Sequence, residues 1–190
     1  MVGIMAKTDM RTDNDTLVGR ARTDADALGA LYELYYDRIY RFLVYRLFDK
    51  HVAQDVTSDV FLAVARGMRA FAGTTEADFR NWLYAIAANH ANAWIRKATR
   101  RRRLLAQAAI RIAATDDNGK DDYEPDWPTL YRAILELKPK NQTIVTLRFF
   151  ENMEFEQIAQ IVGDKAATVR VTLHRILGKL RRTLQAGLDG

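Results

Sequence analysis

The sequence contains no cysteine, and its 190 residues include only three prolines and three histidines. Without cysteine the chain has no disulfide framework, no thiolate nucleophile and no cysteine-ligated zinc, and we expect a reducing compartment. His51, His90 and His174 are far apart, and none has the spacing of a metal site such as H-E-x-x-H. A glycine-rich phosphate loop is also missing. We therefore expect no metal, no cofactor and no catalytic activity.

Long apolar runs are absent as well. No stretch approaches the roughly 18 to 20 consecutive apolar residues of a membrane span, and acidic residues occupy the place of a signal-peptide core. The sequence therefore predicts a cytoplasmic protein that does not enter a membrane. Residues 1–23 are polar and lack a helical pattern, with Met1, Met5 and Met10 as alternative starts, so we expect a flexible tail there.

The remaining pattern is helical. Apolar residues recur at steps of three and four over 24–103 and again over 128–185, and no alternating run is long enough for a sheet. Residues 104–127 are acidic, carry Gly119 and Pro125, and have no apolar period. The sequence predicts an all-α protein with two small helical domains, 24–103 and 128–185, joined by an acidic flexible linker, 104–127.

Residues 156–175 have the pattern of a helix-turn-helix. Ala159 is small where two helices would cross, and Gly163 can take the positive φ of a tight turn. The outward face of the second helix is basic, which suits a helix lying in a major groove between two phosphate strands. The alternative for this segment alone is a helical hairpin with a solvated, charged outer face.

Aromatic and amide side chains precede a strongly basic run. Residues 79–94 are rich in both types, and residues 96–103 contain arginine and lysine but no acidic residue. Unpaired bases stack on aromatic rings while arginines follow the phosphates, so this combination is typical of single-stranded nucleic-acid binding. The alternative is that the aromatic side chains belong to the core and the arginines form a solvated helix end.

Two carboxylates mark a third surface. On a helix, Asp55 and Asp59 lie one turn apart on one side, whereas Val56, Val60 and Val64 lie on another. Such a stripe can dock a partner protein, and it is also a common feature of ordinary amphipathic helices.

Three blocks together resemble the extracytoplasmic-function (ECF) group of the sigma-70 family, the small two-domain sigma factors of bacterial RNA polymerase. Asp55 to Phe61, DVTSDVF, is similar to the family's D-x-x-Q-E-x-F, and Phe79 to Asn89, FRNWLYAIAAN, is similar to its F-x-x-W-L-Y-x-I-A-x-N. The third block is the helix-turn-helix. The resemblance implies a sigma region 2 domain over 24–103, a region 4 domain over 128–185, and a factor that directs core polymerase to promoters.

The same resemblance implies three sets of contacts. Core polymerase would meet the first domain through the clamp helices of its largest subunit, at Asp55, Ser58, Asp59 and Phe61, and the second domain through the flap of its second-largest subunit. A loop carrying Asn89, His90 and Asn92 would capture a base flipped from the melted minus-10 strand. The full minus-10 set is Phe71, Phe79, Trp82, Asn89, His90, Asn92, Arg96, Lys97, Arg100 and Arg101. The minus-35 duplex would be read by Lys165, Thr168, Arg170, Val171, His174, Arg175 and Lys179.

The chain departs from the family pattern at a few positions. Ser58 stands where glutamine is usual, and Asp164-Lys165 replaces an apolar-serine pair at the turn, so we expect Asp164 to cap the recognition helix and to shift its register. An anti-sigma factor is a further expected partner. The alternatives are a stand-alone dimeric helix-turn-helix regulator and a nucleic-acid-processing enzyme, although an enzyme would need clustered carboxylates within a folded domain.

Overall fold

The structure, a computed structural model, describes residues 13–112 and 133–188, and every regular element in these two ranges is helical. The all-α prediction is confirmed. A short helix covers 13–20. It is followed by α2 (Ala25–Leu47), α3 (Lys50–Gly67), the 3-10 turn η1 (Met68–Ala70), α4 (Glu76–Ile112), α6 (Pro139–Phe149), α7 (Phe155–Val162) and α8 (Ala166–Leu188). Within the described ranges, none of these helices is long and apolar enough to cross a membrane.

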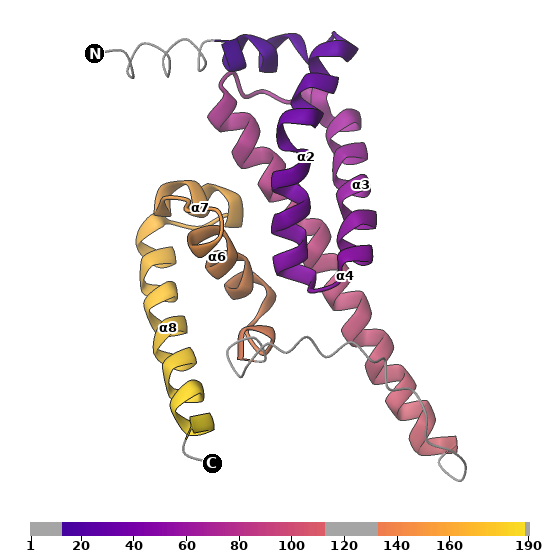
Figure 1. Ribbon diagram of the computed structural model, residues 1–190, viewed down its shortest axis with the longest axis vertical. Coiled ribbons are helices and arrows are strands. Elements are labelled where there is room, and N and C mark those ends of the chain that lie inside the picture. Colours follow the sequence, from indigo (N-terminus) through magenta and orange to yellow (C-terminus); the bar gives the residue numbers. More distant parts are fainter. Residues whose placement is uncertain (1–12, 113–132, 189–190) are drawn as a thin grey trace.

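Helices α2, α3 and the first half of α4 form an antiparallel bundle, the N-terminal half of the molecule (Figure 1). Aspartates begin the first two of these helices: the Asp24 carboxylate accepts the backbone N–H of Asp26, and that of Asp49 accepts the N–H of Val52. Between them, α2 ends at Phe48, whose φ of 58° turns the chain sharply. The connection between α2 and α3 is therefore a tight corner.

The start of α4 is fixed from two directions. Thr75 and Asp78 form a reciprocal cap, in which the Thr75 hydroxyl accepts the Asp78 N–H and the Asp78 carboxylate accepts the Thr75 N–H, both at 3.1 Å. The Asp15 carboxylate accepts the N–H of Glu76 at 2.6 Å. The helix over 13–20 thus closes the end of the bundle and supplies part of the cap of α4 (Figure 1).

Two predicted boundaries differ from the structure. Residues 13–20 were expected in a flexible tail, but they are helical, because Val18 is fully buried in the core and Leu17 packs partly buried against it. Residues 104–112 were expected in the linker, but α4 continues through them to Ile112, since leucine and alanine favour helix. The rest of the predicted tail, 1–12, and of the linker, 113–127, lies outside the described residues.

Helices α6, α7 and α8 form the C-terminal half. Pro139 opens α6 at its first position, where a missing N–H has no effect on helix hydrogen bonding. Helix α7 ends at Gly163, whose φ of 64° confirms the predicted glycine turn. Ile158, Ala159, Val169 and Leu173 are buried between α7 and α8, as the helix-turn-helix pattern predicts.

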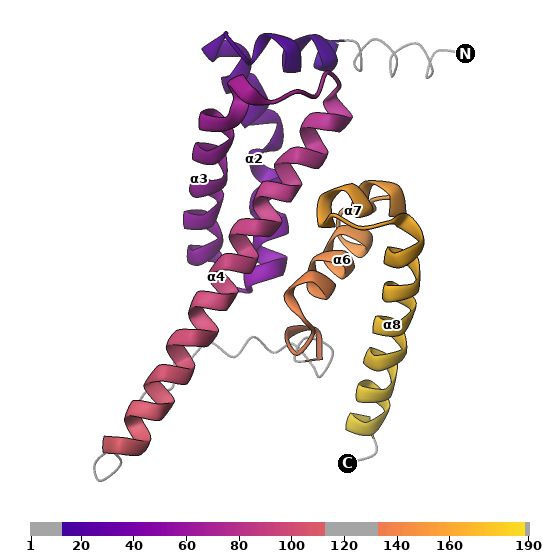
Figure 2. The same cartoon turned by 180° about the vertical axis from the view of Figure 1, so that it is seen from behind.

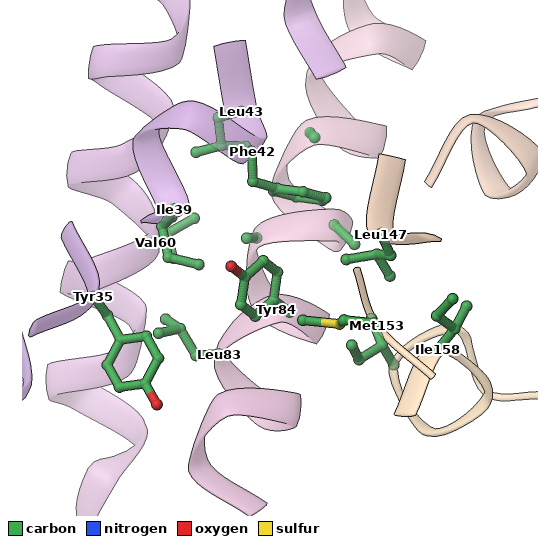
Figure 3. Packing of buried hydrophobic residues seen from close by; sticks show 14 of the residues in the cluster. Tyr35, Ile39, Phe42, Leu43, Val60, Leu83, Tyr84, Leu147, Met153 and Ile158 are labelled. Carbon is green, nitrogen blue, oxygen red and sulfur yellow. The ribbon is translucent and has the colours of Figure 1, made fainter. Parts of the chain in front are cut away.

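The two halves pack against each other and share one apolar core. Helix α7 lies along α4, and α6 contacts both α2 and α4 (Figure 2). At the centre of the contact, Tyr84 of α4 lies between Phe42 of α2 and Met153, and Met153 in turn reaches Leu147 and Ile158 (Figure 3). These side chains belong to a single buried cluster. The two predicted helical domains are therefore both present, and they pack against each other.

Leu83 is a direct test of this core. Its side chain is fully buried, so Leu83→Ala should lower the free energy of unfolding by about 2–5 kcal/mol through lost burial and the cavity that remains. Leu62, 48% exposed on α3, is the matched control, and Leu62→Ala should change stability by no more than about 0.5 kcal/mol. Urea denaturation of both variants measures the difference, and equal effects would contradict the assigned burial.

Two glycines of the helix-turn-helix should respond in opposite directions to the same substitution. Gly163 has a φ of 64°, so Gly163→Ala should destabilise the chain by about 1–2 kcal/mol because a Cβ strains the left-handed conformation. Gly178 lies within α8 with open space around its Cβ position, so Gly178→Ala should stabilise it by about 0.5–1 kcal/mol. Thermal denaturation gives both values, and a stabilising Gly163→Ala would refute the turn.

Candidate nucleic-acid interface

Helix α8 divides cleanly into an apolar face and a basic face. Its apolar face is buried against α6 and α7 through Val169, Leu173, Ile176 and Leu180. The predicted minus-35 residues all lie on the exposed remainder or at the start of the helix: Lys165, Thr168, Arg170, Val171, His174, Arg175 and Lys179. The structure therefore brings the whole predicted set onto one accessible surface. In DNA-binding helix-turn-helix proteins, the second helix lies in the major groove with such an exposed face toward the DNA.

The start of α8 is arranged differently from the expectation. The helix begins at Ala166, and the backbone carbonyl of Lys165 accepts the N–H of Val169 at 3.0 Å, so Lys165 is the cap residue. Asp164 lies one position earlier. Its carboxylate accepts a hydrogen bond from the Lys140 ammonium at 2.8 Å and another from the backbone N–H of Lys165 at 3.0 Å. The bond from Lys140 is the main reason that the pKa of Asp164 is lowered. The predicted Asp164 cap and its register shift are wrong.

An aromatic ring that the sequence reasoning missed supports the recognition helix. The guanidinium groups of Arg148 and Arg170 each lie 4.9 Å from the centre of the Phe155 ring. Arg148 is further fixed by a 2.8 Å hydrogen bond from its Nη1 to the carbonyl of Met153. Phe155 thus orients Arg170 on the exposed face. This contact could not be predicted from the sequence, since Phe155 and Arg170 belong to different helices.

The predicted base-capturing loop is a helix. Asn89, His90 and Asn92 lie in the middle of α4, which is continuous from Glu76 to Ile112. The alanines between Ala85 and Ala93 explain this, because alanine has the highest helix propensity. Asn89 is exposed and His90 is half-buried. The side-chain oxygen of Asn92, in contrast, accepts a 2.7 Å hydrogen bond from Arg46 of α2. Only part of this group is free to meet a ligand.

The aromatic side chains form a connected cluster at the start of α4. Phe71 and Trp82 stack with their ring centres 4.7 Å apart, and both are half-buried. Phe79 is fully buried, with its ring centre 5.5 Å from that of Tyr35 and 6.1 Å from that of Phe71. Of the two expected roles of Phe79, contact with the melted strand or support of the residues that meet it, burial excludes direct contact. Phe79 is a core residue that supports the two accessible rings.

The loop that carries Phe71 is braced by residues outside the predicted set. The Arg22 guanidinium donates to the carbonyl of Gly73, and the Asp78 carboxylate accepts the N–H groups of Thr74 and Thr75 at 3.1 Å. At Gly73 an added Cβ would lie 2.3 Å from the Phe71 ring, so glycine is required there by packing. The loop over 71–75 is the non-helical backbone beside the aromatic cluster.

Further along α4, the basic residues form an arm. Arg96, Lys97, Arg100 and Arg101 are all exposed, and this part of the helix extends beyond the bundle (Figure 1). Arg96 and Arg100 share one side of the helix, as do Lys97 and Arg101. The basic residues therefore follow the aromatic cluster on the same helix, and such exposed positive charge favours the binding of phosphate groups.

The third predicted surface lies on α3. Asp55, Ser58 and Asp59 are exposed, and the Ser58 hydroxyl donates to the carbonyl of Gln54 at 3.2 Å. Phe61 is half-buried, with its ring centre 4.8 Å from that of Tyr32 on α2. Further aromatic rings continue this patch along α2, and the sequence reasoning missed them: Tyr32, Tyr36 and Tyr40. Their spacing of four residues was the available signal.

Comparison with known proteins gives a consistent result. The family model described as Sigma-70 region 2 matches residues 31–101, and that described as Sigma-70, region 4 matches residues 129–180. The ECF sigma factor SigE of Mycolicibacterium smegmatis is 31% identical, over 93% of this chain and 74% of that protein. The sigma factor YlaC of Bacillus subtilis is 28% identical, over 84% of this chain and 92% of YlaC.

The ECF sigma factor BldN of Streptomyces coelicolor is 29% identical over 88% of this chain, which spans 64% of the length of BldN. Among solved structures, CnrH in complex with the cytosolic domain of CnrY has a TM-score of 0.65 at 20% identity, covering 91% of this chain and 97% of that one. RpoE of Bartonella quintana, in complex with the anti-sigma factor NepR, has a TM-score of 0.60 at 17% identity, covering 83% and 96%. At these identities the structural likeness establishes the fold.

The two matched regions, the helix-turn-helix with its basic outer face and the similarity to SigE along most of the chain lead to one conclusion. The chain belongs to the ECF group of the sigma-70 family of RNA polymerase sigma factors.

Proposed function

We propose that this chain binds core RNA polymerase, directs it to promoters by reading a minus-35 duplex with α8, and assists opening by holding the melted minus-10 strand with α4. The observation that carries this proposal is the accessible basic face of α8, on which all the predicted minus-35 residues lie. No chemical step belongs to the chain itself. Its contribution is to bind the opened state of DNA more strongly than the closed one.

Duplex reading would use the N-terminal part of α8. Arginine can donate two hydrogen bonds to the O6 and N7 atoms of guanine, which makes Arg170 and Arg175 the preferred base-reading candidates. Lys179 lies one turn beyond Arg175 and suits a phosphate. Val171, 50% exposed, offers an apolar contact of the kind that a thymine methyl group accepts.

Strand capture would use the surface of α4 around Asn89 and His90, together with the accessible rings of Phe71 and Trp82. Exposed amide groups can form hydrogen bonds with an unpaired base, and exposed rings can stack on it. Duplex DNA does not allow these contacts, because its bases are already paired and stacked. The basic arm from Arg96 to Arg101 would then follow the strand's phosphates. Phe79 supports this surface from the core.

Polymerase binding would use α3 and the neighbouring rings of α2. Helix α3 carries the exposed carboxylates of Asp55 and Asp59 on one side, and Phe61 packs against Tyr32 of α2 on another. Charged groups guide a partner into register, and aromatic residues are enriched in protein interfaces. By the family resemblance, the partner here is the pair of clamp helices of the largest subunit, and the C-terminal half would meet the flap of the second-largest subunit.

An anti-sigma factor is a further proposed partner, and the cytoplasm is the proposed location. The solved relative RpoE is itself described in complex with the anti-sigma factor NepR. Run-off transcription with purified core polymerase and a promoter library tests the function as a whole. Initiation that depends on this chain and selects a two-element consensus supports the proposal, and no initiation at any template refutes it.

Arg175→Ala should weaken promoter binding by about 1–3 kcal/mol and relax selection at one position of the minus-35 element, because a bidentate base contact is lost. Lys179→Ala should weaken binding evenly across sequences, since a phosphate contact carries no base information. Sequencing of the promoters that each polymerase complex selects measures both effects. Arg41→Ala, at an exposed position of α2, is the control, and an unchanged consensus for Arg175→Ala would exclude α8 as the reader.

Asp59→Arg should weaken binding to core polymerase about tenfold or more, equivalent to about 1.4 kcal/mol, because it reverses a charge within the acidic stripe. Glu136→Arg changes the charge equally at an exposed position of the C-terminal half and should have little effect. Affinity is measured by titrating labelled chain with core polymerase at two salt concentrations. Equal affinities for the two variants would remove Asp59 from the interface.

A further inference from the structure

The loop over 71–75 is held in place by side chains. The carbonyl of Gly73 accepts a hydrogen bond from the Arg22 guanidinium, and the N–H of Thr74 donates to the Asp78 carboxylate at 3.1 Å. Asp78 is a local cap from the first turn of α4, whereas Arg22 comes from a distant part of the chain, before α2. The course of this loop therefore depends on where Arg22 is held.

Residues 13–22, which we call the N-terminal segment, meet the loop region at two points. Arg22 donates to Gly73 in the middle of the loop, and the Asp15 carboxylate accepts the N–H of Glu76 at 2.6 Å, directly after the loop. The helix of this segment lies across the end of the bundle beside the loop (Figure 2). The two contacts together fix the middle of the loop and the start of α4.

The N-terminal segment is itself well anchored. Val18 is fully buried and Ala21 is 4% exposed, so its apolar side is part of the core. The side chain of Glu76 accepts a hydrogen bond from the hydroxyl of Tyr35, which is fully buried on α2. Asp15 therefore binds a residue that a second helix also holds, and the segment can act as a rigid support.

The loop backbone and the accessible rings are in close contact. Gly73 packs against Phe71 so tightly that an added Cβ would lie 2.3 Å from the ring. Phe71 stacks on Trp82 with an angle of 27° between the rings. Trp82 also packs against Gly67, the last residue of α3, where an added Cβ would lie 3.0 Å from the indole. A shift of Gly73 would therefore move Phe71 relative to Trp82.

Arg22 is poorly paired for a residue whose role is stability alone. It is half-buried, and its Nε atom is buried without a hydrogen-bond partner among the described residues. A buried N–H group without an acceptor opposes folding. What Arg22 does provide is a charge-assisted bond to one carbonyl of the loop, Gly73, which fixes its position.

We propose that Arg22 and Asp15 are positioning residues for strand capture, which hold the loop over 71–75 so that Phe71 and Trp82 present their rings to an unpaired base. In this role neither residue touches DNA. The inference rests on the proposed function, because only capture of an unpaired strand requires these two rings to be kept in a fixed arrangement.

Two variants of opposite charge separate positioning from simple electrostatics. Arg22→Ala removes a positive charge and Asp15→Ala removes a negative one, so charge alone would make the first bind DNA more weakly and the second more strongly. Positioning predicts weaker binding of the unpaired strand for both, by about tenfold, which corresponds to the loss of roughly one base stack. Asp15→Asn keeps a side-chain oxygen that can accept the Glu76 N–H and should bind nearly as well as the unaltered chain.

The experiment uses the full chain bound to core polymerase and two fragments of one promoter that this complex selects. One fragment is an upstream duplex with the minus-35 element, and the other is a fork whose minus-10 strand is unpaired. Arg22→Ala and Asp15→Ala should lose affinity for the fork and keep their affinity for the duplex within about twofold. Matched controls are Arg20→Ala, at an exposed position that pairs with Asp24, and Asp13→Ala, which is also exposed. Both should bind the two fragments normally.

The dependence of fork binding on salt tests whether Arg22 contacts a phosphate directly. Loss of a phosphate contact lowers the slope of log affinity against log salt concentration by about one. Loss of a positioning residue leaves this slope unchanged, because no counterion is released at Arg22. A lower slope for Arg22→Ala would therefore overturn its positioning role.

The remaining outcomes are equally distinct. Normal fork binding by Arg22→Ala and Asp15→Ala, or stronger binding by Asp15→Ala, overturns the inference, as does an equal loss on fork and duplex by folded variants. Circular dichroism checks the fold, and if Arg22→Ala is unfolded, the comparison of Asp15→Ala with Asp15→Asn decides. An unaltered complex that selects no promoter, or binds the fork no better than the duplex, refutes the proposed function instead.

Discussion

One helix, α4, has to satisfy three different surroundings with a single period of 3.6 residues. Phe79, Leu83 and Ala87 recur on the side that faces the bundle core. Asn81, Tyr84 and Asn92 lie on an adjoining side and make the contacts with α2 and the C-terminal half. Asn89, Arg96 and Arg100 are left on the outer side. A change in register anywhere along this helix would therefore alter the core, the contact between the halves and the basic surface together.

Much of the fold was predictable because it depends on local rules. The spacing of Ile158, Val169 and Leu173 defines two helices around Gly163, and no distant residue is needed to recognise them. The start of α3 after Asp49 and the loop at Gly73 likewise depend on local capping and turn chemistry. The helix over 13–20 escaped prediction because its stability comes from a tertiary contact, in which Val18 enters the core and Asp15 reaches the backbone of Glu76.

The candidate site was less predictable, since exposure and partner choice are properties of the folded chain. The predicted minus-35 residues could be grouped from the period of a single helix, α8, because that period places them on its exposed side. The α4 set mixed residues of different fates: Phe79 is buried, Asn92 is held by Arg46 and Asn89 is exposed. The sequence of a stretch rich in aromatic and amide residues does not show which amide will accept a hydrogen bond from a distant arginine. The burial of Arg46 could not be predicted either, because a charged residue at the end of an amphipathic helix usually faces water.

The contacts between the two halves are mainly between neutral groups. Ionic strength should therefore affect these contacts less than it affects binding to phosphate. Arg46 meets amide and carbonyl oxygens, Asn81 meets Gln160, and Tyr45 stacks on Phe150 with ring centres 4.1 Å apart. Counterions screen interactions between exposed charges and have little effect on such pairs. Binding of the basic faces to phosphate, in contrast, declines steeply as salt is added. Added salt should therefore weaken the proposed binding to nucleic acid while leaving the packing of the two halves nearly unchanged.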